Sequence, residues 1–295
     1  MSEIHIRVLR HSAFYSPLIV VIAGGFLRDE GLKPSYSIAT PDKTVPGGIA
    51  DGSVHVAQSA VSTSWMLMEK DEAPNYVHFA QINERDGFFI AGRKAEPAFS
   101  WKNLIGKKVL VDHFFQPLAM FKYALHQQGV AFDQIDALDA GDVDAIDQAF
   151  RYGDADYVHQ QGPAPQQLEK DGEGFVVASI GEVIGPVAFS SLCASREWLA
   201  SDMAQAFMRA YRRARQYVID AEAQEIAHAE TEFFPHIDRE VLIHTVATYQ
   251  RLGCWAPGAR ITREAYERAL DVFEYNGLIT RRHAYDDVVT LPPDE

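Results

Sequence analysis

The opening segment constrains the fold more than any other part of the chain, and it comprises residues 3–36, EIHIRVLRHSAFYSPLIVVIAGGFLRDEGLKPSY. Apolar and polar residues alternate over 4–8, which is the two-residue period of a strand. After a short loop, Ser16 is the predicted N-cap of a helix whose first residue is Pro17. Gly31 can end that helix in the left-handed conformation, and a second strand follows. This order predicts the start of an α/β fold.

Strand and helix signals go on alternating through the first two thirds of the chain, which predicts α/β architecture with mostly parallel strands. The strand-like runs after the opening unit are 54–57, 76–82, 88–91, 109–111, 155–158, 175–178 and 187–195. Residues 159–165 read as a loop that follows one of these strands. From residue 201 onward the pattern is helical.

The polar, proline-containing segment 92–103 is suited to a crossover between two lobes. We therefore predict a discontinuous first lobe formed by residues 1–92 and 187–295, and a second lobe formed by residues 93–186. In such α/β folds, ligands bind at the carboxyl ends of strands and at helix N-termini. A cleft between the lobes is the predicted binding site. The helical tail could wrap the first lobe or form a dimer.

Composition and charge exclude several classes of function. The 295 residues carry a net charge of −14 and contain no basic block, which argues against nucleic-acid binding. No segment approaches the roughly 20 apolar residues of a membrane span. The first strand follows the initial Met-Ser directly, without a signal peptide, so we expect a cytoplasmic protein, or a periplasmic one if the natural start lies upstream. Cys193 and Cys254 are expected to be reduced core thiols.

Two phrases carry a family resemblance: GFLRDEGL before the second strand, and WKNLIGKKV at 101–109, where the second lobe begins. The chain resembles the type II periplasmic-binding-protein superfamily, and within it the branch of aliphatic-sulfonate, nitrate and taurine receptors and thiamine-pyrimidine synthases. The resemblance implies a two-lobed α/β fold with a helical C-terminal segment, closing by a hinge around one small organic ligand. It also implies an ABC permease as partner if the protein is exported. From the residues themselves we expect no cofactor and no metal.

Side chains that follow predicted strands locate the cleft. From the first lobe these are Arg10, His11, Ser12, Phe14, Tyr15, Gln58, Ser59, Ser62, Thr63, Asn83, Arg85 and Asp86, and from the second His113, Phe114, Phe115, Gln116, His159, Gln160 and Gln161. From them we select eight predicted ligand-binding residues: His11, Tyr15, Ser59, Thr63, Arg85, His113, Gln116 and His159.

Each selected residue type has a chemical reason. Tyr15 can form an aromatic wall with its hydroxyl at a wet rim, or it can fill the core. Ser59 and Thr63 precede or begin a helix, where hydroxyls and free N–H groups can cradle an anion or simply cap the helix. Arg85 can clamp a carboxylate or sulfonate, or pair with a neighbouring acid on the surface. The spacing of His11, His113 and His159 is not local, so a metal site is a weak alternative to single histidines that bind ligand.

Two enzymatic branches of the superfamily can be compared residue by residue. The pyrimidine synthases carry a histidine where this chain has Thr63, and a cysteine-rich segment where it has residues 184–188. The aromatic sulfinate desulfinases resemble this chain at Gly-Phe-Phe 87–89, but their cysteine falls on Ser12. A serine without a neighbouring base is a poor nucleophile. Both chemistries are therefore disfavoured.

Two hypotheses follow. The first is a non-catalytic protein that binds a small organic ligand, aromatic or heterocyclic, with an anion as one alternative, and is homologous to the substrate-binding components of ABC importers. The second is a cytosolic enzyme of the same fold that acts on a small aromatic or heterocyclic acid as a desulfinase, decarboxylase or hydrolase. Its candidate catalytic residues are Ser12, His11 and His113.

Overall fold

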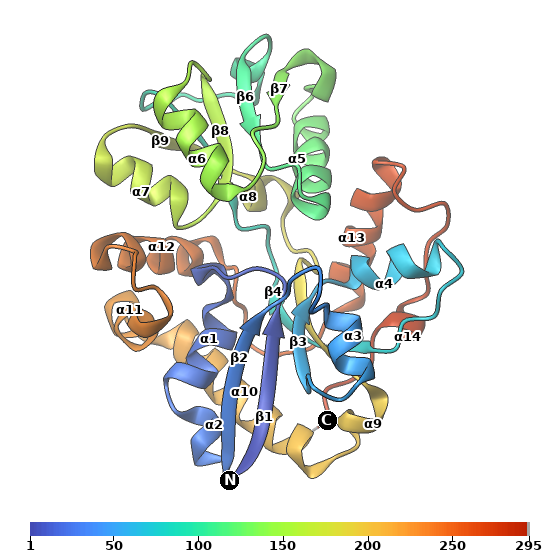
Figure 1. Cartoon of the computed structure of the whole chain (residues 1–295). Helices are drawn as coiled ribbons and strands as arrows, with labels where there is room; N and C mark the ends of the chain where they lie inside the picture. The colour runs from blue at the N-terminus through green and yellow to red at the C-terminus, as the bar shows by residue number, and fades with distance from the viewer. Residues whose placement is uncertain (294–295) are drawn as a thin grey trace.

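The computed structural model describes residues 1–293 and has two lobes, each built on a five-stranded mixed sheet (Figure 1). The first sheet has the order β2 (Leu32–Ile38), β1 (Ser2–Val8), β3 (Val56–Ser59), β10 (Ser190–Ala194) and β4 (Val77–Asn83). The second sheet has the order β7 (Asp136–Leu138), β6 (Lys108–Val111), β8 (Tyr157–Gln161), β5 (Phe88–Gly92) and β9 (Phe175–Ser179). The two-lobed α/β fold predicted from the sequence is confirmed.

Helices cover both sheets. In the first lobe they are α1 (Ser16–Ala23), α2 (Phe26–Asp29), α3 (Val45–Ala50) and α4 (Val61–Met68), with the 3-10 turn η1 (Ala13–Tyr15). In the second they are α5 (Phe115–Gln127), α6 (Val143–Tyr152), α7 (Ala164–Asp171) and α8 (Ile180–Ile184), with η2 (Trp101–Leu104) and η3 (Phe132–Gln134). The tail forms α9 (Arg196–Leu199), α10 (Asp202–Asp220), α11 (Ala223–Glu230), η4 (Thr231–Phe233), α12 (Arg239–Leu252), α13 (Arg263–Tyr275) and α14 (Tyr285–Val288).

The opening unit folds as the sequence indicates, with one change at the helix start. Strands β1 and β2 pair in parallel from Ser2 opposite Leu32 onward. Ser16 is already helical and donates to Ala13 O, while Ser12 caps the preceding turn by accepting from Phe14 N. This bond stabilises the turn, because the Ser12 side chain gives the N–H of Phe14, two residues later, an acceptor. This turn sets the direction of the loop that faces the second lobe.

The crossings between the lobes are short. Strand β5 pairs antiparallel with β8 and β9, so it belongs to the second sheet. The chain therefore first crosses at residues 84–87. The predicted boundary after residue 92 is corrected, because β5 belongs to the second lobe and not to the first. The chain crosses back at residues 185–189, between α8 and β10.

Strand β8 is also longer than predicted, because residues 159–161 continue the ladder opposite β5 instead of forming a loop. A strand fixes which residues share a face, since successive side chains point to opposite sides. His159 and Gln161 therefore share one face of the second sheet and Gln160 points to the other.

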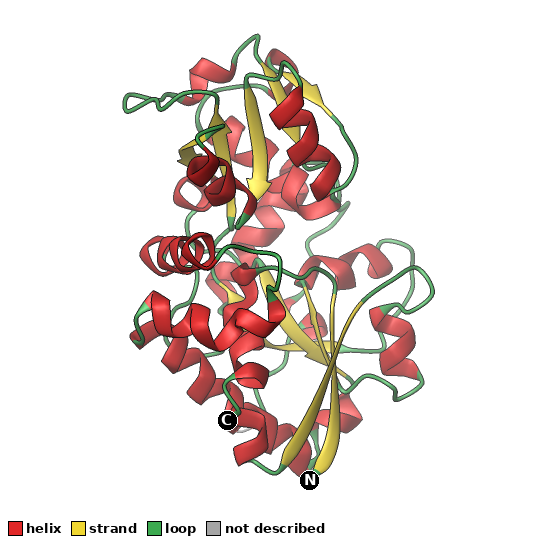
Figure 2. Ribbon diagram, turned by 60° about the vertical axis from the view of Figure 1, so that its left-hand side comes forward, coloured by secondary structure: helices red, strands yellow, loops and turns green. Residues whose placement is uncertain are grey.

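The tail helices pack mainly on the first lobe, and α12 also lies against α7 of the second (Figure 1). Figure 2 shows the two lobes from another side, with helices around the strands of each. Among the helices of residues 1–293, none combines the length and apolar character of a membrane-spanning segment. Cys193 and Cys254 are both buried and free.

Candidate functional site

Side-chain contacts bridge the lobes where the strands of both sheets end. The Arg10 guanidinium lies 2.8 Å from Asp112 Oδ2, and this is an ion pair between the first and second lobes. Nearby, Ser12 Oγ donates to Gly162 O at 2.8 Å. These bonds hold the lobes in a closed arrangement.

A third bridge runs through a glutamine at the start of α5. Ser62 Oγ donates to Gln116 Oε1 at 2.7 Å, and Gln116 Nε2 donates to Phe189 O at 2.6 Å. Gln116 belongs to the second lobe, whereas Ser62 lies on α4 and Phe189 lies on the return crossing. One side chain thus joins the second lobe to a helix of the first lobe and to the crossing segment.

Four residues of these contacts, Arg10, Ser62, Gln116 and Phe189, line a cavity of about 110 Å³, which we call the inner cavity. Its lining combines aromatic, hydroxyl and amide side chains with one guanidinium, from Leu9, Arg10, Tyr15, Gln58, Ser59, Ala60, Ser62, Thr63, Phe88, Phe114, Phe115, Gln116, Pro117, Gln161, Phe189 and Ser190. Both lobes contribute, so a molecule held here would contact both.

Two helices from opposite lobes begin at the inner cavity. The N-caps of α4 and α5 are Ala60 and Phe114, and neither helix start has a side-chain cap. The first N–H groups of a helix lack partners within it and carry a partial positive charge. The cavity is therefore a place where an anion is favoured, although the protein as a whole is strongly negative.

Gln161 adds a polar group that the protein itself leaves unsatisfied. It closes strand β8, is 7% exposed, and its Nε2 has no hydrogen-bond partner. A buried donor without a partner is costly, so such a group usually marks a water or ligand position.

Aromatic rings form the apolar part of the wall. The Arg10 guanidinium lies 5.6 Å from the Phe88 ring centroid and 5.2 Å from that of Phe114. Phe114 is 56% exposed and lies at the rim. Burial raises the pKa of Tyr15 to about 12, so its hydroxyl stays protonated and can donate. This wall can bury a flat apolar group beside hydrogen-bond donors.

Four of the eight selected residues line the inner cavity, namely Tyr15, Ser59, Thr63 and Gln116. Two of them also bond to each other, because Ser59 Oγ and Thr63 Oγ1 lie 2.9 Å apart. Thr63 Oγ1 also donates to Ala60 O, and Tyr76 Oη lies 3.0 Å away. The hydroxyls of α4 therefore serve the helix start as well as facing the cavity.

The other four selected residues do not line the inner cavity. His11 lies beside it, with Nδ1 2.8 Å from Tyr36 Oη and Nε2 2.7 Å from Phe233 O. Arg85 turns away and donates to Gly181 O at 3.0 Å, so its predicted position in the cleft is corrected. Arg85 lies on the first crossing itself, at residues 84–87, and is not among the residues that line the inner cavity.

His113 and His159 also point elsewhere. His113 Nδ1 lies 2.8 Å from Val111 O, within its own turn. His159 is fully buried and is stacked between Phe88 and Phe121, with both ring centroids 4.7 Å away. Burial lowers the pKa of His159 to about 3, so the ring is neutral. It therefore supports the wall at Phe88 from behind.

The positions of Ser12, His11 and His113 do not assemble a nucleophile with a base. The Ser12 hydroxyl is engaged with Gly162 O, and both nitrogens of His11 are engaged with Tyr36 and Phe233. Nucleophilic catalysis requires a base within hydrogen-bond reach of the hydroxyl. Within residues 1–293 no group of three His, Cys, Asp or Glu side chains is arranged to hold a metal ion.

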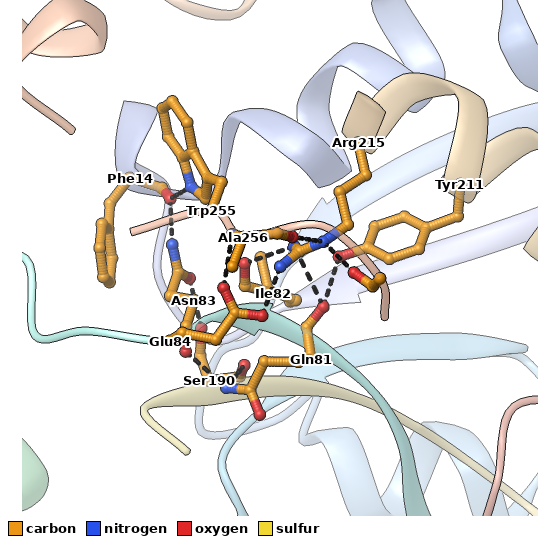
Figure 3. A network of polar contacts seen from close by, with 11 residues as sticks. Phe14, Gln81, Ile82, Asn83, Glu84, Ser190, Tyr211, Arg215, Trp255 and Ala256 are labelled. Carbon is orange, nitrogen blue, oxygen red and sulfur yellow. Dashed lines mark hydrogen bonds and ion pairs between the residues drawn. The ribbon is translucent and has the colours of Figure 1, made fainter. Parts of the chain in front are cut away.

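A buried network fixes the first crossing to the tail (Figure 3). Arg215 Nη2 lies 2.6 Å from Glu84 Oε1, and Glu84 Oε2 accepts from Ala256 N at 2.6 Å. Burial raises the pKa of Glu84, while Arg215 opposes that rise. Beside this pair, Asn83 Nδ2 donates to Phe14 O at 2.6 Å. The end of β4 is thereby tied to the loop that carries Tyr15.

Several lining residues were outside the eight selected from the sequence. Arg10 and Gln161 were among the wider set that follows strands, and nothing in their local pattern separated them from their neighbours. Phe88 belongs to a predicted strand and to the Gly-Phe-Phe phrase at 87–89, and neither pattern predicts a place in the cleft.

Comparisons with known proteins agree with this architecture. The model of the family described as NMT1/THI5 like matches residues 13–224. YtlA of Bacillus subtilis (strain 168), whose name marks it as a candidate binding protein, is 26% identical over 294 residues, covering 98% of this chain and 88% of YtlA.

Two solved structures are similar in fold. The periplasmic aliphatic sulphonate binding protein SsuA of Escherichia coli has a TM-score of 0.76 at 14% identity, covering 99% of this chain and 93% of SsuA. The ligand binding component of an ABC-type import system of Staphylococcus aureus has a TM-score of 0.75 at 18% identity, covering 100% of this chain and 98% of that one.

Proposed function

The chain belongs to the NMT1/THI5-like family, and from this premise we propose that it binds a small organic anion in the inner cavity, as the ligand-binding component of an ABC-type import system. The names of its relatives support the proposal, since they describe a candidate binding protein, a sulphonate-binding protein and an import component. The partner would be a membrane permease that receives the ligand.

The observation that carries the proposal is the meeting of two helix starts from opposite lobes. Helices α4 and α5 both begin at the inner cavity without side-chain caps. A carboxylate or sulfonate placed between them would accept from backbone N–H groups and gain from both helix dipoles. Gln161 Nε2, which is buried and unpartnered, would supply a further donor.

The same geometry explains selectivity for an anion in a protein of net charge −14. Arg10 is the charged side chain of the lining, and Asp112 already balances it. Attraction must therefore come from local dipoles and not from the overall field, which repels anions. The rings of Phe88 and Phe114 would enclose the apolar part of the ligand.

Binding would also hold the lobes together. A ligand can accept hydrogen bonds from α4 and α5 simultaneously only when the lobes are closed. It therefore binds the closed state more tightly than the open state, and this difference in affinity favours the closed state. In an importer, the closed liganded form and the open empty form present different surfaces, so a permease can bind the liganded form selectively.

The test is calorimetric titration of the purified protein with butanesulfonate, benzenesulfonate, benzoate and inorganic phosphate. We expect at least one organic anion to bind. We also expect Gln161→Leu to weaken its binding about tenfold or more, because a hydrogen bond to a charged group contributes about 1.5–3 kcal/mol. The matched control is Gln205→Leu on the exposed face of α10, which should leave the affinity unchanged.

Binding of none of these anions at millimolar concentration would refute the proposal. Equal affinity in the wild type and in Gln161→Leu would also refute it, because the anion would then lie outside the inner cavity.

A further inference from the structure

A second cavity lies on the surface of the first lobe, away from the cleft, and we call it the basal pocket. Its volume is about 590 Å³, and it is lined by Arg196, residues 260–263, Tyr285, Asp286 and residues 289–291. The first of these begins α9, the second group leads into α13, and the others belong to α14 and the segment after it. The basal pocket and the inner cavity have no lining residue in common.

The topology of the first sheet separates the two sites. Strand β10 begins with Ser190, which lines the inner cavity, and ends with Ala194, two residues before Arg196. The two ends of this strand are about 13 Å apart, because a strand rises about 3.3 Å per residue. Figure 1 shows α9 in the part of the first lobe that is remote from the second lobe. The basal pocket is therefore a site distinct from the cleft.

Hydrogen bonds fix the walls of the basal pocket. Thr290 N donates to His78 O at 2.9 Å, which ties the wall formed by residues 289–291 to β4. The Tyr285 hydroxyl donates to Ile261 O, which joins α14 to the segment before α13. The elements that carry the charged residues of the pocket are thus held in place without a ligand.

The lining carries an excess of positive charge, in contrast to the chain as a whole. It contains three arginines, Arg196, Arg260 and Arg263, and one acid, Asp286. Three guanidinium groups against one carboxylate leave two net positive charges, whereas the whole chain has a net charge of −14. Arg263 Nη2 lies 2.7 Å from Asp286 Oδ1, and Arg263 Cζ lies 4.3 Å from the Tyr285 ring centroid. The pocket therefore attracts anions locally on a protein whose overall field repels them.

Other acids near the basal pocket lie outside its lining. Glu197, Glu264 and Asp287 each adjoin a lining residue in the sequence, but none of them lines the pocket. Glu267 on α13 is held by Arg282 at 2.7 Å. The charge that a ligand meets at the walls of the pocket is therefore positive.

The number and type of these donors favour a doubly charged anion with several oxygens. A guanidinium group donates in a planar fork that matches the oxygens of phosphate, and a phosphate monoester carries a charge of about −1.5 to −2 at pH 7. We propose that the basal pocket binds the phosphate group of a phosphate monoester, from a soluble compound or from a phosphatidic acid headgroup. This site goes beyond the proposed function, because it requires no ligand between the lobes.

The test is calorimetric titration with phenyl phosphate, and with phenyl sulfate as a probe of similar shape and only one negative charge. We expect phenyl phosphate to bind more tightly than phenyl sulfate. In Arg196→Gln the affinity for phenyl phosphate should fall about threefold, which is within the range of exposed ion pairs. In Asp286→Asn that affinity should rise by about the same factor, because the change removes the carboxylate of the lining and releases Arg263. Misfolding cannot produce such a gain.

Vesicle sedimentation distinguishes the two sources of the phosphate group. If the ligand is a lipid, phosphatidylcholine vesicles that contain phosphatidic acid should bind the wild type more than Arg196→Gln, and pure phosphatidylcholine vesicles should bind neither. If the ligand is a soluble ester, phenyl phosphate should bind and both kinds of vesicle should leave the protein in solution.

The matched control is Arg281→Gln, the same change at an exposed arginine outside the pocket, and it should leave the affinity for phenyl phosphate unchanged. The inference would be overturned if neither phenyl phosphate nor phosphatidic acid vesicles bound, if phenyl phosphate and phenyl sulfate bound equally, or if Arg196→Gln and Asp286→Asn both bound as the wild type does. Loss of phenyl phosphate binding in Gln161→Leu instead would place the phosphate in the inner cavity and would also overturn the inference.

Discussion

We predict that the buried ion pair between Arg215 and Glu84, which fixes the first crossing to the tail, contributes strongly to the stability of the protein. The Arg215 side chain is 2% exposed, and besides its ion pair with Glu84 it donates to Ile82 O at 2.8 Å and to Ala256 O at 3.0 Å. In Arg215→Met the carboxylate of Glu84 would stay buried without its counter-charge. Breaking a buried pair in this way costs about 3–5 kcal/mol. Since about 1 kcal/mol shifts the Tm by roughly 2–4 °C in large chains, we expect the Tm to fall by about 6–20 °C.

The assay is thermal unfolding followed by circular dichroism, with Arg282→Met as the matched control. Arg282 pairs with Glu267, Asp271 and Glu274, but its side chain is 37% exposed. Exposed pairs contribute about 1 kcal/mol or less, so the Tm of this control should change by only a few degrees. A fall of less than about 2 °C in Arg215→Met, or equal falls in the two variants, would refute the reasoning.

The pH dependence of Arg215→Met follows from the same carboxyl. Burial raises the pKa of Glu84, and Arg215 opposes the rise, so the pKa is higher still without Arg215. A carboxyl whose pKa is higher in the folded than in the unfolded state destabilises the fold increasingly as the pH rises. The Tm gap between variant and wild type should therefore narrow towards about pH 5. The double variant with Glu84→Gln should recover part of the loss, because no unpaired charge remains.

Two further predictions concern single side chains. Burial raises the pKa of Glu230 from 4.5 to about 8, so this carboxyl contributes stability below about pH 4.5 that is lost as the pH rises towards 8. In Glu230→Gln, the free energy of unfolding in urea should therefore fall less steeply with pH, by up to about 1.4 kcal/mol per pH unit. An unchanged slope would contradict a buried protonated acid. Ser12→Ala removes both the donor to Gly162 O across the lobes and the acceptor of Phe14 N, and should lower the free energy of unfolding by about 1 kcal/mol or more; no loss would contradict both bonds.

The sequence predicts the lobes and the location of the cleft because both follow from periodicity and from chain order. The alternation at residues 4–8 yields β1, and the residues after it reach the cavity edge. Periodicity and chain order do not decide which of the two sheets contains strand 88–92. A fully buried strand is apolar on both faces, so its local pattern is the same in either sheet, and only long-range pairing with β8 and β9 decides.

For individual site residues, the position along the strand matters as well as the face. His159 and Gln161 share a face of β8, but His159 lies two residues further into the sheet and is covered by Phe121. Gln161 stands at the strand end and lines the inner cavity. The sequence predicts the end of this strand at residue 158 and therefore places both residues in a loop, where a histidine is expected to contact a ligand.

The helical tail contacts both lobes at residues that lie outside the inner cavity. Tyr249 on α12 donates from its hydroxyl to Gly87 O at 3.1 Å and accepts from Gly162 N at 2.8 Å, so one side chain of the tail joins the first crossing to the end of β8. Gly162 O is also the acceptor of Ser12. Any separation of the lobes would have to break these bonds together. The helical tail therefore helps to hold the two lobes against each other.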